Sequence, residues 1–515
     1  MEYIKKLKEE SLVDFAERLS ELYNQTNTKK NKKSKGQFFT PKLIAEFMAS
    51  FSNQTKSNIS ILDPGAGMGI LSVAAIEKLS SQNKVKSIEL TAYETDREVI
   101  PFLKNVMGEA KGYLNQKGIS FESNVIEADF VISNANVLTT NLNNFDKPNG
   151  KTYNLVISNP PYFKLTKTDI MSIKCKNIIS GQPNIYFLFM AISSKLLSKD
   201  GEMIFITPRS FCSGLYYSKF RKWLMLNVNF SNIHIFDSRK DLFLSQEVLQ
   251  ENIITKFTNK PGEGIEISKS FNGDLSDSSK IKVKTEDVIY RSNGDIFFRI
   301  PSNKEELMAI RQLDKLPFNF YKLGIKISTG KVVAFRNKEQ LTSSIDSNSV
   351  PLLWMHNIKN GQVEWPLSKK DKPTAIKNNS ETQRKLLLKS GNYLVLKRFT
   401  TKEQKKRFDT APIFEDDFKQ YKYFALDNMI NYIYNPNKNL TKVQIRGIAR
   451  YLNLPIVELY FRILNGHTQV NANEVYALPF PSMAELENIG KKATGTNLNS
   501  YATFGNNNFI KEICK

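Results

Sequence analysis

The sequence predicts an α/β fold in its N-terminal half, with a mostly parallel sheet covered by helices on both faces, followed by a second domain of mixed α and β structure. Two observations lead to this prediction. Short apolar runs alternate with longer amphipathic stretches from about residue 59 to residue 260, which is typical of βαβ units. The length of 515 residues also exceeds the size at which a single hydrophobic core keeps growing, so two large domains are expected.

Apolar periodicity places the individual elements along the chain. Helical spacing predicts helices over residues 2–23, 70–79 and 185–197, and over 454–464 in the second domain. Apolar runs predict strands over residues 59–62, 87–93, 153–158, 202–207, 232–236 and 252–257, and over 350–355 and 393–399 in the second domain. No convincing helix separates 232–236 from 252–257, which predicts an antiparallel hairpin at one edge of the first sheet.

A change in composition marks the expected domain boundary. Residues 260–284 are rich in Gly, Ser, Asp and Lys and poor in large apolar residues. We therefore expect an N-terminal helix and basic linker over 1–35, a first domain over 36–285, a second over 286–485 and a tail over 486–515. The lysine-rich stretch 26–35 suits a solvated linker and an arm that contacts phosphates equally well.

The charge of the chain favours a polyanionic partner. The formal net charge is +22, from 73 Lys and Arg against 51 Asp and Glu. Nucleic acid is the simplest partner for so basic a protein, although positive charge spread over a solvated surface is the alternative. The three cysteines and three histidines are widely separated, so no structural metal site is expected. The start of the chain lacks the apolar stretch of a secretory signal, which predicts a cytoplasmic protein.

Polar residues at the ends of predicted strands indicate a cofactor site. Asp63, Gly65 and Gly67 follow the first strand, and glycines at alternate positions allow a tight turn and close approach to a ligand. The spacing differs from that of dinucleotide loops. An acidic residue before the loop suits the ammonium and sulfonium of S-adenosylmethionine. Glu94 ends the next strand, where a carboxylate can accept both ribose hydroxyls, and Asp129 with Phe130 suits an adenine ring.

The sequence Asn159-Pro160-Pro161-Tyr162 follows the 153–158 strand and indicates the chemistry. Residues that precede proline adopt extended conformations, so the Asn159 side-chain carbonyl and the Pro160 main-chain carbonyl are rigid acceptors. Together they can bind both hydrogens of a planar exocyclic amine and orient its nitrogen for methyl transfer without a strong general base. Tyr162 would stack on the extracted base.

With these motifs the chain resembles the gamma-class, TaqI-like DNA adenine methyltransferases of restriction-modification systems. The residues that carry the resemblance are Gly36-Gln37-Phe38-Phe39-Thr40-Pro41, Asp63-Pro64-Gly65-Ala66-Gly67, Glu94, Asp129-Phe130 and Asn159-Pro160-Pro161-Tyr162. The resemblance implies a Rossmann-like S-adenosylmethionine-dependent methyltransferase domain that modifies N6 of a flipped adenine in double-stranded DNA. It also implies that Thr40 contacts the carboxylate end of the cofactor. Phe257 is the candidate for a second aromatic against the flipped base, with a core-strand phenylalanine as the alternative.

The C-terminal half is similar to the target-recognition domains of PstI- and BsuBI-type modification enzymes. The likeness rests on residues 328–333, 397–399 and 465–472. Basic side chains suit guanine edges or phosphates, and amide side chains suit adenine. The candidates for DNA contact are Lys331, Arg336, Asn357, Lys397, Arg398 and Gln469.

Several alternatives stay open at the level of sequence. Asn-Pro-Pro-Tyr also serves methyltransferases that act on RNA bases or on protein glutamine. A non-catalytic DNA-binding protein and a combined nuclease and methyltransferase are further alternatives, although only about 35 residues precede the Gly36 element. We expect a monomer, with a separate cognate restriction endonuclease as a possible partner. The recognition sequence is not predicted.

Overall fold

The computed structural model describes residues 4–26, 39–138, 151–181, 184–236, 251–271, 274–367, 369, 372–400, 404, 406–465 and 469–492. The chain divides into two compact units, Met1–Asn303 and Lys304–Lys515, which we call the N-terminal unit and the C-terminal unit. Among the described residues, no helix combines the length and apolar character needed to cross a membrane. The basic stretch 27–35 and Gly36, Gln37 and Phe38 lie outside the described residues.

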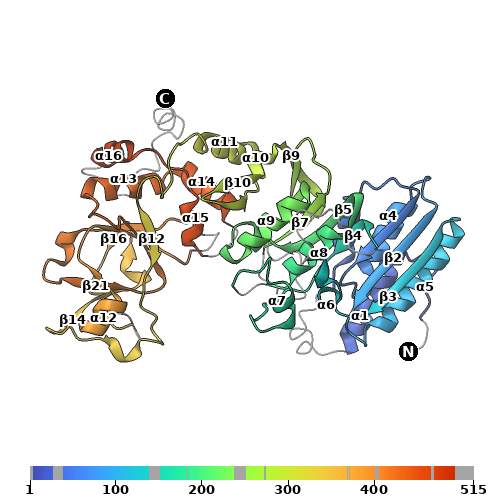
Figure 1. The fold of residues 1–515 in the computed structure, drawn as a ribbon, viewed down its shortest axis with the longest axis horizontal. Helices are drawn as coiled ribbons and strands as arrows, with labels where there is room; N and C mark the ends of the chain where they lie inside the picture. Colours follow the sequence, from blue (N-terminus) through green and yellow to red (C-terminus); the bar gives the residue numbers. More distant parts are fainter. Residues whose placement is uncertain are drawn as a thin grey trace. The chain divides into compact units, whose positions relative to one another are not determined.

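The N-terminal unit is built on a nine-stranded mixed sheet in the order β3-β2-β1-β4-β5-β7-β6-β8-β9 (Figure 1). Its strands are β1 (Asn58–Asp63), β2 (Ser87–Glu94), β3 (Ser120–Glu127), β4 (Tyr153–Ser158), β5 (Leu197–Pro208), β6 (Asn229–Phe236), β7 (Asn252–Thr258), β8 (Ile265–Phe271) and β9 (Asp274–Val283). Strands β1 to β5 run parallel to one another. They therefore end at one edge of the sheet, near Asp63, Glu94, Ser158 and Pro208, which we call the carboxyl edge.

Helices form two groups against this sheet. The helices of the unit are α1 (Leu12–Thr26), α3 (Lys42–Ser50), α4 (Ile70–Ser80), α5 (Ile100–Gln116), α6 (Phe130–Asn134), α7 (Ile170–Lys174), α8 (Tyr186–Lys195), α9 (Ser218–Asn227) and α10 (Thr285–Val288), with the 3-10 turns η1 (Ala135–Leu138), η2 (Arg209–Cys212) and η3 (Leu215–Tyr217). Helices α1, α3, α4 and α5 contact one another, and α6 and α9 contact α8. The strand order reverses between β1 and β4, where right-handed crossovers direct helices to opposite faces.

The structure confirms the predicted fold class and corrects three of its details. All six strands predicted in the first domain are present, but β3 was not predicted. The predicted 232–236 and 252–257 hairpin is antiparallel but lies inside the sheet rather than at its edge. Residues 260–284, whose composition marked the expected domain boundary, form β8 and β9, and this pair provides the antiparallel edge.

The described part of the C-terminal unit contains a four-stranded sheet, a five-stranded sheet, the two-stranded pair β15-β16 and a cluster of helices. A four-stranded sheet has the order β12-β22-β19-β20 and a five-stranded sheet the order β13-β17-β14-β21-β18. The strands are β12 (Lys326–Thr329), β13 (Leu341–Thr342), β14 (Ser349–Leu353), β15 (Ile358–Lys359), β16 (Gln362–Val363), β17 (Ala375–Lys377), β18 (Leu387–Lys389), β19 (Tyr393–Lys397), β20 (Thr410–Ile413), β21 (Tyr423–Leu426) and β22 (Ile430–Tyr434), while β10 (Ile289–Ser292) and β11 (Asp295–Phe298) pair in the N-terminal unit.

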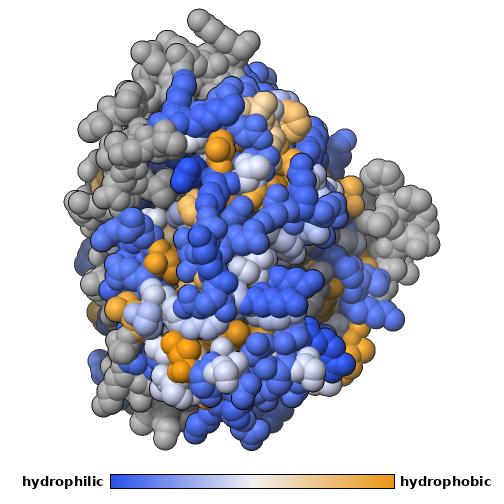
Figure 2. Space-filling model, turned by 90° about the vertical axis from the view of Figure 1, so that its left-hand side faces the viewer, coloured by the Kyte–Doolittle hydropathy of each residue, from blue (hydrophilic) through white to orange (hydrophobic). Residues whose placement is uncertain are grey.

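Most helices of the C-terminal unit lie near its first or last residues in the sequence. They are α11 (Lys304–Leu313), α12 (Ser380–Lys385), α13 (Lys442–Leu452), α14 (Pro455–Leu464), α15 (Ala472–Tyr476) and α16 (Met483–Lys491), with the 3-10 turns η4 (Lys338–Gln340), η5 (Met355–Asn357) and η6 (Glu415–Phe418). Helix α13 has Thr441 at its N-cap, whose side chain accepts from Gln444 N–H, a bond that favours helix initiation. The strands predicted at 350–355 and 393–399 and the helix predicted at 454–464 are all present. The surface seen in Figure 2 is predominantly hydrophilic, with apolar side chains in small scattered groups.

Candidate active site

The predicted cofactor loop and the Asn-Pro-Pro-Tyr motif meet at the carboxyl edge. Strands β1 and β4 are adjacent and parallel, with Ile61 opposite Leu155 and Leu62 opposite Val156. Asp63 and Asn159 therefore leave neighbouring strands at nearly the same level. This is the position at which open α/β sheets bind ligands, because the strand order reverses there.

The glycine loop has the geometry that its spacing predicts. Gly67 and Gly69 have φ values of 54° and 82°, in the left-handed region that side-chain-bearing residues seldom adopt. A Cβ on Gly67 would lie 3.4 Å from the Phe39 ring, and one on Gly69 only 2.8 Å from Leu103 Cδ1. Both positions thus favour glycine because of their backbone conformation, and a side chain at Gly69 would also displace Leu103.

Asp63 is a fully buried carboxyl group at the start of this loop. Its Oδ2 accepts a 2.7 Å hydrogen bond from Ser72 Oγ on α4, whereas its Oδ1 is buried and receives no well-formed hydrogen bond from the described residues. Burial raises the pKa of Asp63 to about 7, against the lowering effect of Ser72 and of the nearby Gly65 amide. A buried oxygen of this kind is suited to a cationic donor group. Ser72 was not predicted, because a serine one turn into an apolar helix carries no distinctive sequence signal.

Glu94, at the end of β2, is held by main-chain donors. Its Oε2 accepts from Gly67 N–H at 2.9 Å, and its Oε1 accepts from Thr95 N–H and Asp96 N–H at 2.7 and 2.8 Å. Burial is the largest influence on its pKa and raises it, while the three amides lower it. These bonds orient the carboxylate beside the glycine loop and leave lone pairs for a ligand hydroxyl.

Asp129 and Phe130 follow β3 and begin α6. Asp129 is the N-cap, and its Oδ1 accepts from Ile132 N–H at 2.7 Å. Phe130 is buried and lies between Tyr93 and Phe189, with ring centroids at 5.3 and 5.2 Å. The Phe189 side chain also lies 3.5 Å from the position of a Cβ on Gly65. An aromatic wall therefore connects Phe130 to the glycine loop.

Asn159 is held from two sides by hydroxyl groups. Its Nδ2 donates to Thr40 Oγ1 at 3.1 Å, and its Oδ1 accepts from Tyr162 Oη at 2.6 Å. The Tyr162 hydroxyl also lies 2.9 Å from the main-chain carbonyl oxygen of Ile206 on β5. In this arrangement the Asn159 amide oxygen faces Tyr162 and the amide nitrogen faces Thr40. The contact between Thr40 and Asn159 was not predicted, since 119 residues separate them.

Tyr162 combines a half-buried ring with a fully buried hydroxyl. Burial raises the pKa of the Tyr162 hydroxyl well above its usual range, so the group is a neutral donor at physiological pH. The ring lies edge-on to Tyr186 on α8, at 6.1 Å between centroids. Pro160, next to Asn159, is buried.

The structure does not bring Phe257 to this site. The residue is fully buried and lies opposite Met203 of β5, five residues before Pro208 and the carboxyl edge. Its ring packs on Phe230 at 4.4 Å between centroids. We therefore correct its assignment as a base-stacking residue to that of a core-strand phenylalanine, which the sequence had left open.

In the C-terminal unit, three of the predicted DNA-contacting residues lie near one another. Main-chain hydrogen bonds join Val332 to Asn428 and Arg398 to Met429. Arg398 also donates to Asn428 O at 3.2 Å and to Gln469 Oε1 at 3.3 Å. Lys331 precedes Val332 and is exposed. Lys331, Arg398 and Gln469 therefore surround the turn between β21 and β22.

The other three candidates have different surroundings. Arg336 is exposed and stacks over Phe335, at 5.3 Å from the ring centroid. Lys397 forms a 2.7 Å ion pair with Asp409. Asn357 is buried, and its side chain bonds Trp354 N–H and Glu364 O. Its prediction as a DNA-contacting residue is corrected, because its Oδ1 accepts from the main chain at the start of η5 and its Nδ2 donates to the main chain after β16.

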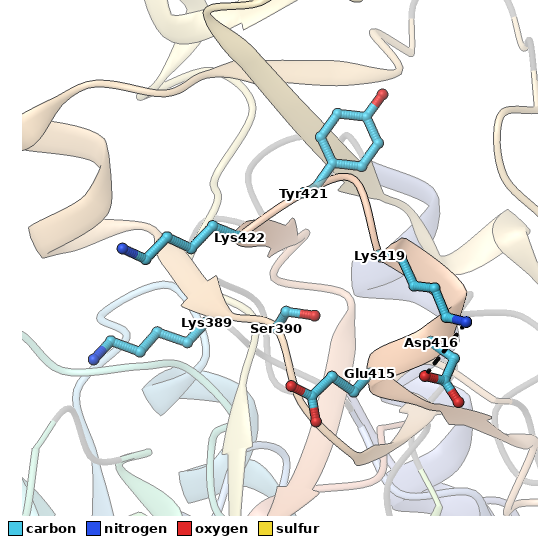
Figure 3. A pocket seen from close by; sticks show the side chains of 7 residues that line it. All are labelled: Lys389, Ser390, Glu415, Asp416, Lys419, Tyr421 and Lys422. Atoms are coloured by element: carbon cyan, nitrogen blue, oxygen red, sulfur yellow. Dashed lines mark ion pairs between the residues drawn. The ribbon is translucent and has the colours of Figure 1, made fainter.

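A shallow pocket in the C-terminal unit holds none of the predicted site residues (Figure 3). It is lined by Lys389, Ser390, Glu415, Asp416, Lys419, Tyr421 and Lys422. Asp416 forms ion pairs with Lys419 and Lys442, so its charge is compensated within the protein. The pocket belongs to the C-terminal unit, whereas Asn159 belongs to the N-terminal unit. In the described part of the chain no cluster of His, Cys, Asp or Glu suits a metal ion.

Comparisons with known proteins identify relatives of the chain. Residues 73–243 match the family model of the Eco57I restriction-modification methylase. The type II methyltransferase M.PstI of Providencia stuartii is 32% identical over 484 residues, which is 94% of each chain. M.BsuBI of Bacillus subtilis is 33% identical over 464 residues, 90% of each chain. The type IIL restriction-modification enzyme MmeI, solved in complex with DNA, aligns over 94% of this chain and 70% of its own, with a TM-score of 0.51 and 9% identity.

Proposed function

The chain belongs to the type II methyltransferases of restriction-modification systems, and on this basis we propose that it methylates N6 of an adenine flipped out of double-stranded DNA. Membership makes it a DNA methyltransferase of host protection that uses S-adenosylmethionine. The observation that supports an exocyclic amine as the methyl acceptor is the Asn159 site, and the order of the motifs, which resembles that of adenine methyltransferases, favours adenine among such amines. The site presents an oriented amide oxygen at the carboxyl edge, beside the cofactor loop.

The residues at the carboxyl edge fit S-adenosylmethionine. The buried Asp63 Oδ1 suits a cationic group, Gly67 gives the loop the left-handed turn that its spacing predicts, and the Glu94 carboxylate is oriented for hydroxyls. Phe130 supplies an aromatic wall. When bound, this cofactor supplies an electrophilic methyl group.

The chain contributes orientation to the reaction. The Asn159 Oδ1 and the Pro160 carbonyl oxygen would accept the two hydrogens of the exocyclic amine. Accepting both bonds directs the nitrogen lone pair out of the plane of the base, toward the cofactor loop. The amine would not lose a proton beforehand. As the N–C bond forms and the bond between the methyl group and the donor sulfur breaks, the nitrogen would become positively charged, and it would then release a proton to water. No strong general base is therefore needed for the attack, and preorganised acceptors supply the main rate effect.

The Tyr162 hydroxyl donates to Asn159 Oδ1 in this structure, and two features support the proposal that a base can bind beside it. An amide oxygen has two acceptor sites, so Asn159 Oδ1 can accept from an amine in addition to Tyr162. The Ile206 carbonyl oxygen, 2.9 Å from the hydroxyl, offers Tyr162 a second acceptor. The tyrosine ring would then stack against the base, a contact worth about 1 to 3 kcal/mol.

The inaccessibility of a paired base supports base flipping, and the charge of the chain supports DNA as the substrate. An amine paired inside a duplex cannot reach a pocket at a sheet edge unless the base is extruded. The net charge of +22 suits a polyphosphate. The C-terminal unit carries Lys331, Arg336 and Arg398, and we propose that it reads the DNA sequence.

The decisive experiment measures where a labelled methyl group goes. Purified protein, labelled S-adenosylmethionine and bacterial genomic DNA are incubated, and the DNA is hydrolysed to nucleosides. We expect label in N6-methyladenine, and none with the Asn159→Ala variant, which should still bind DNA and cofactor. Label in methylated cytosine would refute the adenine assignment. Parallel incubations with RNA and with a protein extract test the two alternative substrate classes.

A further inference from the structure

Two loops that follow β4 and β5 lie at the carboxyl edge beside the Asn159 motif. The first, residues 163–181, is a folded excursion rather than an open strand of chain. Ile185 N–H donates to Phe163 O at 2.9 Å and closes its base. Leu165, Cys175 and Ile178 turn inward and are at most 4% exposed. The excursion is therefore anchored by its own apolar side chains.

Other apolar side chains of these loops remain outside the core. Phe163, Ile170 and Ile173 are 37%, 55% and 58% exposed. In the second loop, η3 presents Leu215 and Tyr216 at 60% and 55% exposure. The two loops touch, because a Cβ on Gly181 would lie 2.3 Å from the Tyr216 ring. We call these five apolar residues, with the lysines described next, the loop surface.

The loop surface is strongly positive. Lys164, Lys167, Lys174 and Lys176 are all exposed. The acidic residue of the excursion, Asp169, accepts a hydrogen bond from Thr166 N–H and so faces its own loop. Exposed apolar side chains and four exposed lysines on an excursion whose one carboxylate faces its own loop are complementary to a polyanion that also offers apolar surface. Duplex DNA with an extruded base has that chemistry.

We propose that the loop surface binds the duplex on either side of the extruded base. This rests on the proposed function, since it assumes that a base enters the Asn159 pocket. Such a base stays joined to its backbone, so its flanking phosphates must lie just outside the pocket, where Phe163 follows Asn159 by four positions. The lysines contact these phosphates. The apolar side chains, with Ile170 and Ile173 foremost, lie against the sugars and base faces that extrusion uncovers.

Lysine variants test the phosphate contacts through salt dependence. A fluorescein-labelled DNA duplex is titrated with protein over a range of salt concentrations in the presence of cofactor. The slope of log K against log salt falls by about 0.9 for each phosphate that the protein no longer neutralises. We expect Lys164→Ala with Lys167→Ala to lower the slope by roughly 1 to 2. The matched control, Lys104→Ala with Lys111→Ala, changes two exposed lysines on α5. It should lower the slope by less than the loop variant does.

Isoleucine variants test the apolar contacts, because burial of apolar surface releases no counterions. We expect Ile170→Ser with Ile173→Ser to weaken duplex binding about threefold or more at every salt concentration, with an unchanged slope. Leu226→Ser on α9, which alters a side chain 68% exposed, is the control and should bind as the wild type does. All these side chains are exposed, so thermal unfolding should be unaffected.

The outcomes separate this proposal from the proposed function. If the loop variants and their controls bind the duplex equally and with equal slopes, the loop surface does not contact DNA, whatever base is methylated. If the loop variants behave as expected but the label appears in cytosine, the adenine assignment fails and the loop surface stands. Loss of cofactor affinity in the loop variants would also overturn the proposal, because it would indicate a disturbed fold.

Discussion

Thr40 and Asn159 are 119 residues apart in the sequence, and a 3.1 Å hydrogen bond from Asn159 Nδ2 to Thr40 Oγ1 joins them. An asparagine amide can rotate to exchange its oxygen and nitrogen, and the exchanged form would present a donor to an amine that needs acceptors. The Thr40 acceptor on one side and the Tyr162 donor on the other both oppose that rotation. The segment before the cofactor loop thereby sets the orientation of the residue proposed for catalysis.

Replacement of Thr40 should therefore slow methyl transfer. We expect Thr40→Val to lower kcat about tenfold, the effect of one hydrogen bond of roughly 1.4 kcal/mol, while Thr40→Ser retains most of the activity because its hydroxyl remains. Single-turnover rates at saturating cofactor separate this effect from weaker cofactor binding. Equal rates for the valine and serine variants would contradict a positioning role.

Changes at Asn159 and Tyr162 should differ in size. Asn159→Ala removes a proposed transition-state acceptor and should lower kcat by about 100-fold or more. Tyr162→Phe keeps the ring but loses the bonds to Asn159 and Ile206, so a loss of under about tenfold is expected. Tyr162→Ala also loses stacking and should fall between the two. A Tyr162→Phe variant as inactive as Asn159→Ala would show that the hydroxyl has a larger role than orienting the amide.

Phe257 should matter for stability rather than for base binding. Its ring is fully buried against Phe230, and truncation of such a side chain costs about 3 to 5 kcal/mol. We expect Phe257→Ala to lower the melting temperature, and Phe257→Leu to lower it less. Below the transition, the KM for DNA of Phe257→Leu should equal that of the wild type. A raised KM with an unchanged melting temperature would restore Phe257 as a base-contacting residue.

The sequence predicted the central strands of the N-terminal unit because they are buried on both faces and hence continuously apolar. Strand β4, for example, is buried at every position. Strand β3 is an edge strand with exposed residues at Ser120, Glu122, Ser123 and Asn124, so its composition resembles a loop. Strand β9 lies at the other edge of the sheet and was missed for the same reason. Strand β8 lies inside the sheet and is mostly buried, but serine, lysine and glutamate interrupt its apolar residues, so it was missed as well.

The candidate site was predicted where a motif and its function share a short segment, as at Asp63 and Asn159. Side chains whose role depends on distant partners were not predictable. The Asn357 amide has the right chemistry for an adenine edge, yet both of its polar atoms already form hydrogen bonds to the main chain of Trp354 and Glu364. Phe257 has the right residue type, but strand register places it away from the carboxyl edge. The residue type indicates which interactions a side chain can form, whereas strand register and burial determine which groups it contacts.

The C-terminal unit allows a direct test of these two kinds of residue. Lys331→Ala removes an exposed charge and should lower the salt slope of DNA binding by about 1 if the side chain contacts a phosphate. Asn357→Ala should leave that slope unchanged and lower the melting temperature, because it removes the bonds that hold η5. An altered DNA recognition sequence in Asn357→Ala, detected by mapping methylated sites, would contradict the structural role.

Cofactor binding should depend on pH through Asp63. Burial raises its pKa to about 7, so the protonated carboxyl predominates in the free folded protein below that pH. A folded-state pKa above the unfolded value means that the contribution to stability is greatest at low pH and is lost as pH rises through about 7. A cationic ligand binds better to the ionised form of Asp63. The affinity of the protein for S-adenosylmethionine should therefore rise about tenfold per pH unit below pH 7 and level off above it, as measured by isothermal titration.

The isosteric variant Asp63→Asn isolates this effect, since an amide does not titrate in this range. We expect its cofactor affinity to be low and independent of pH between about 5.5 and 7, and its thermal stability to lose the decline that the wild type shows as pH rises. The amide can still accept from Ser72 Oγ, so the loop should keep its conformation. A wild-type affinity that stays constant across this range would mean that Asp63 is ionised before the cofactor binds. That result would refute the raised pKa of Asp63. It would not refute a charge contact between Asp63 and the cofactor, which weaker cofactor binding by Asp63→Asn would still support.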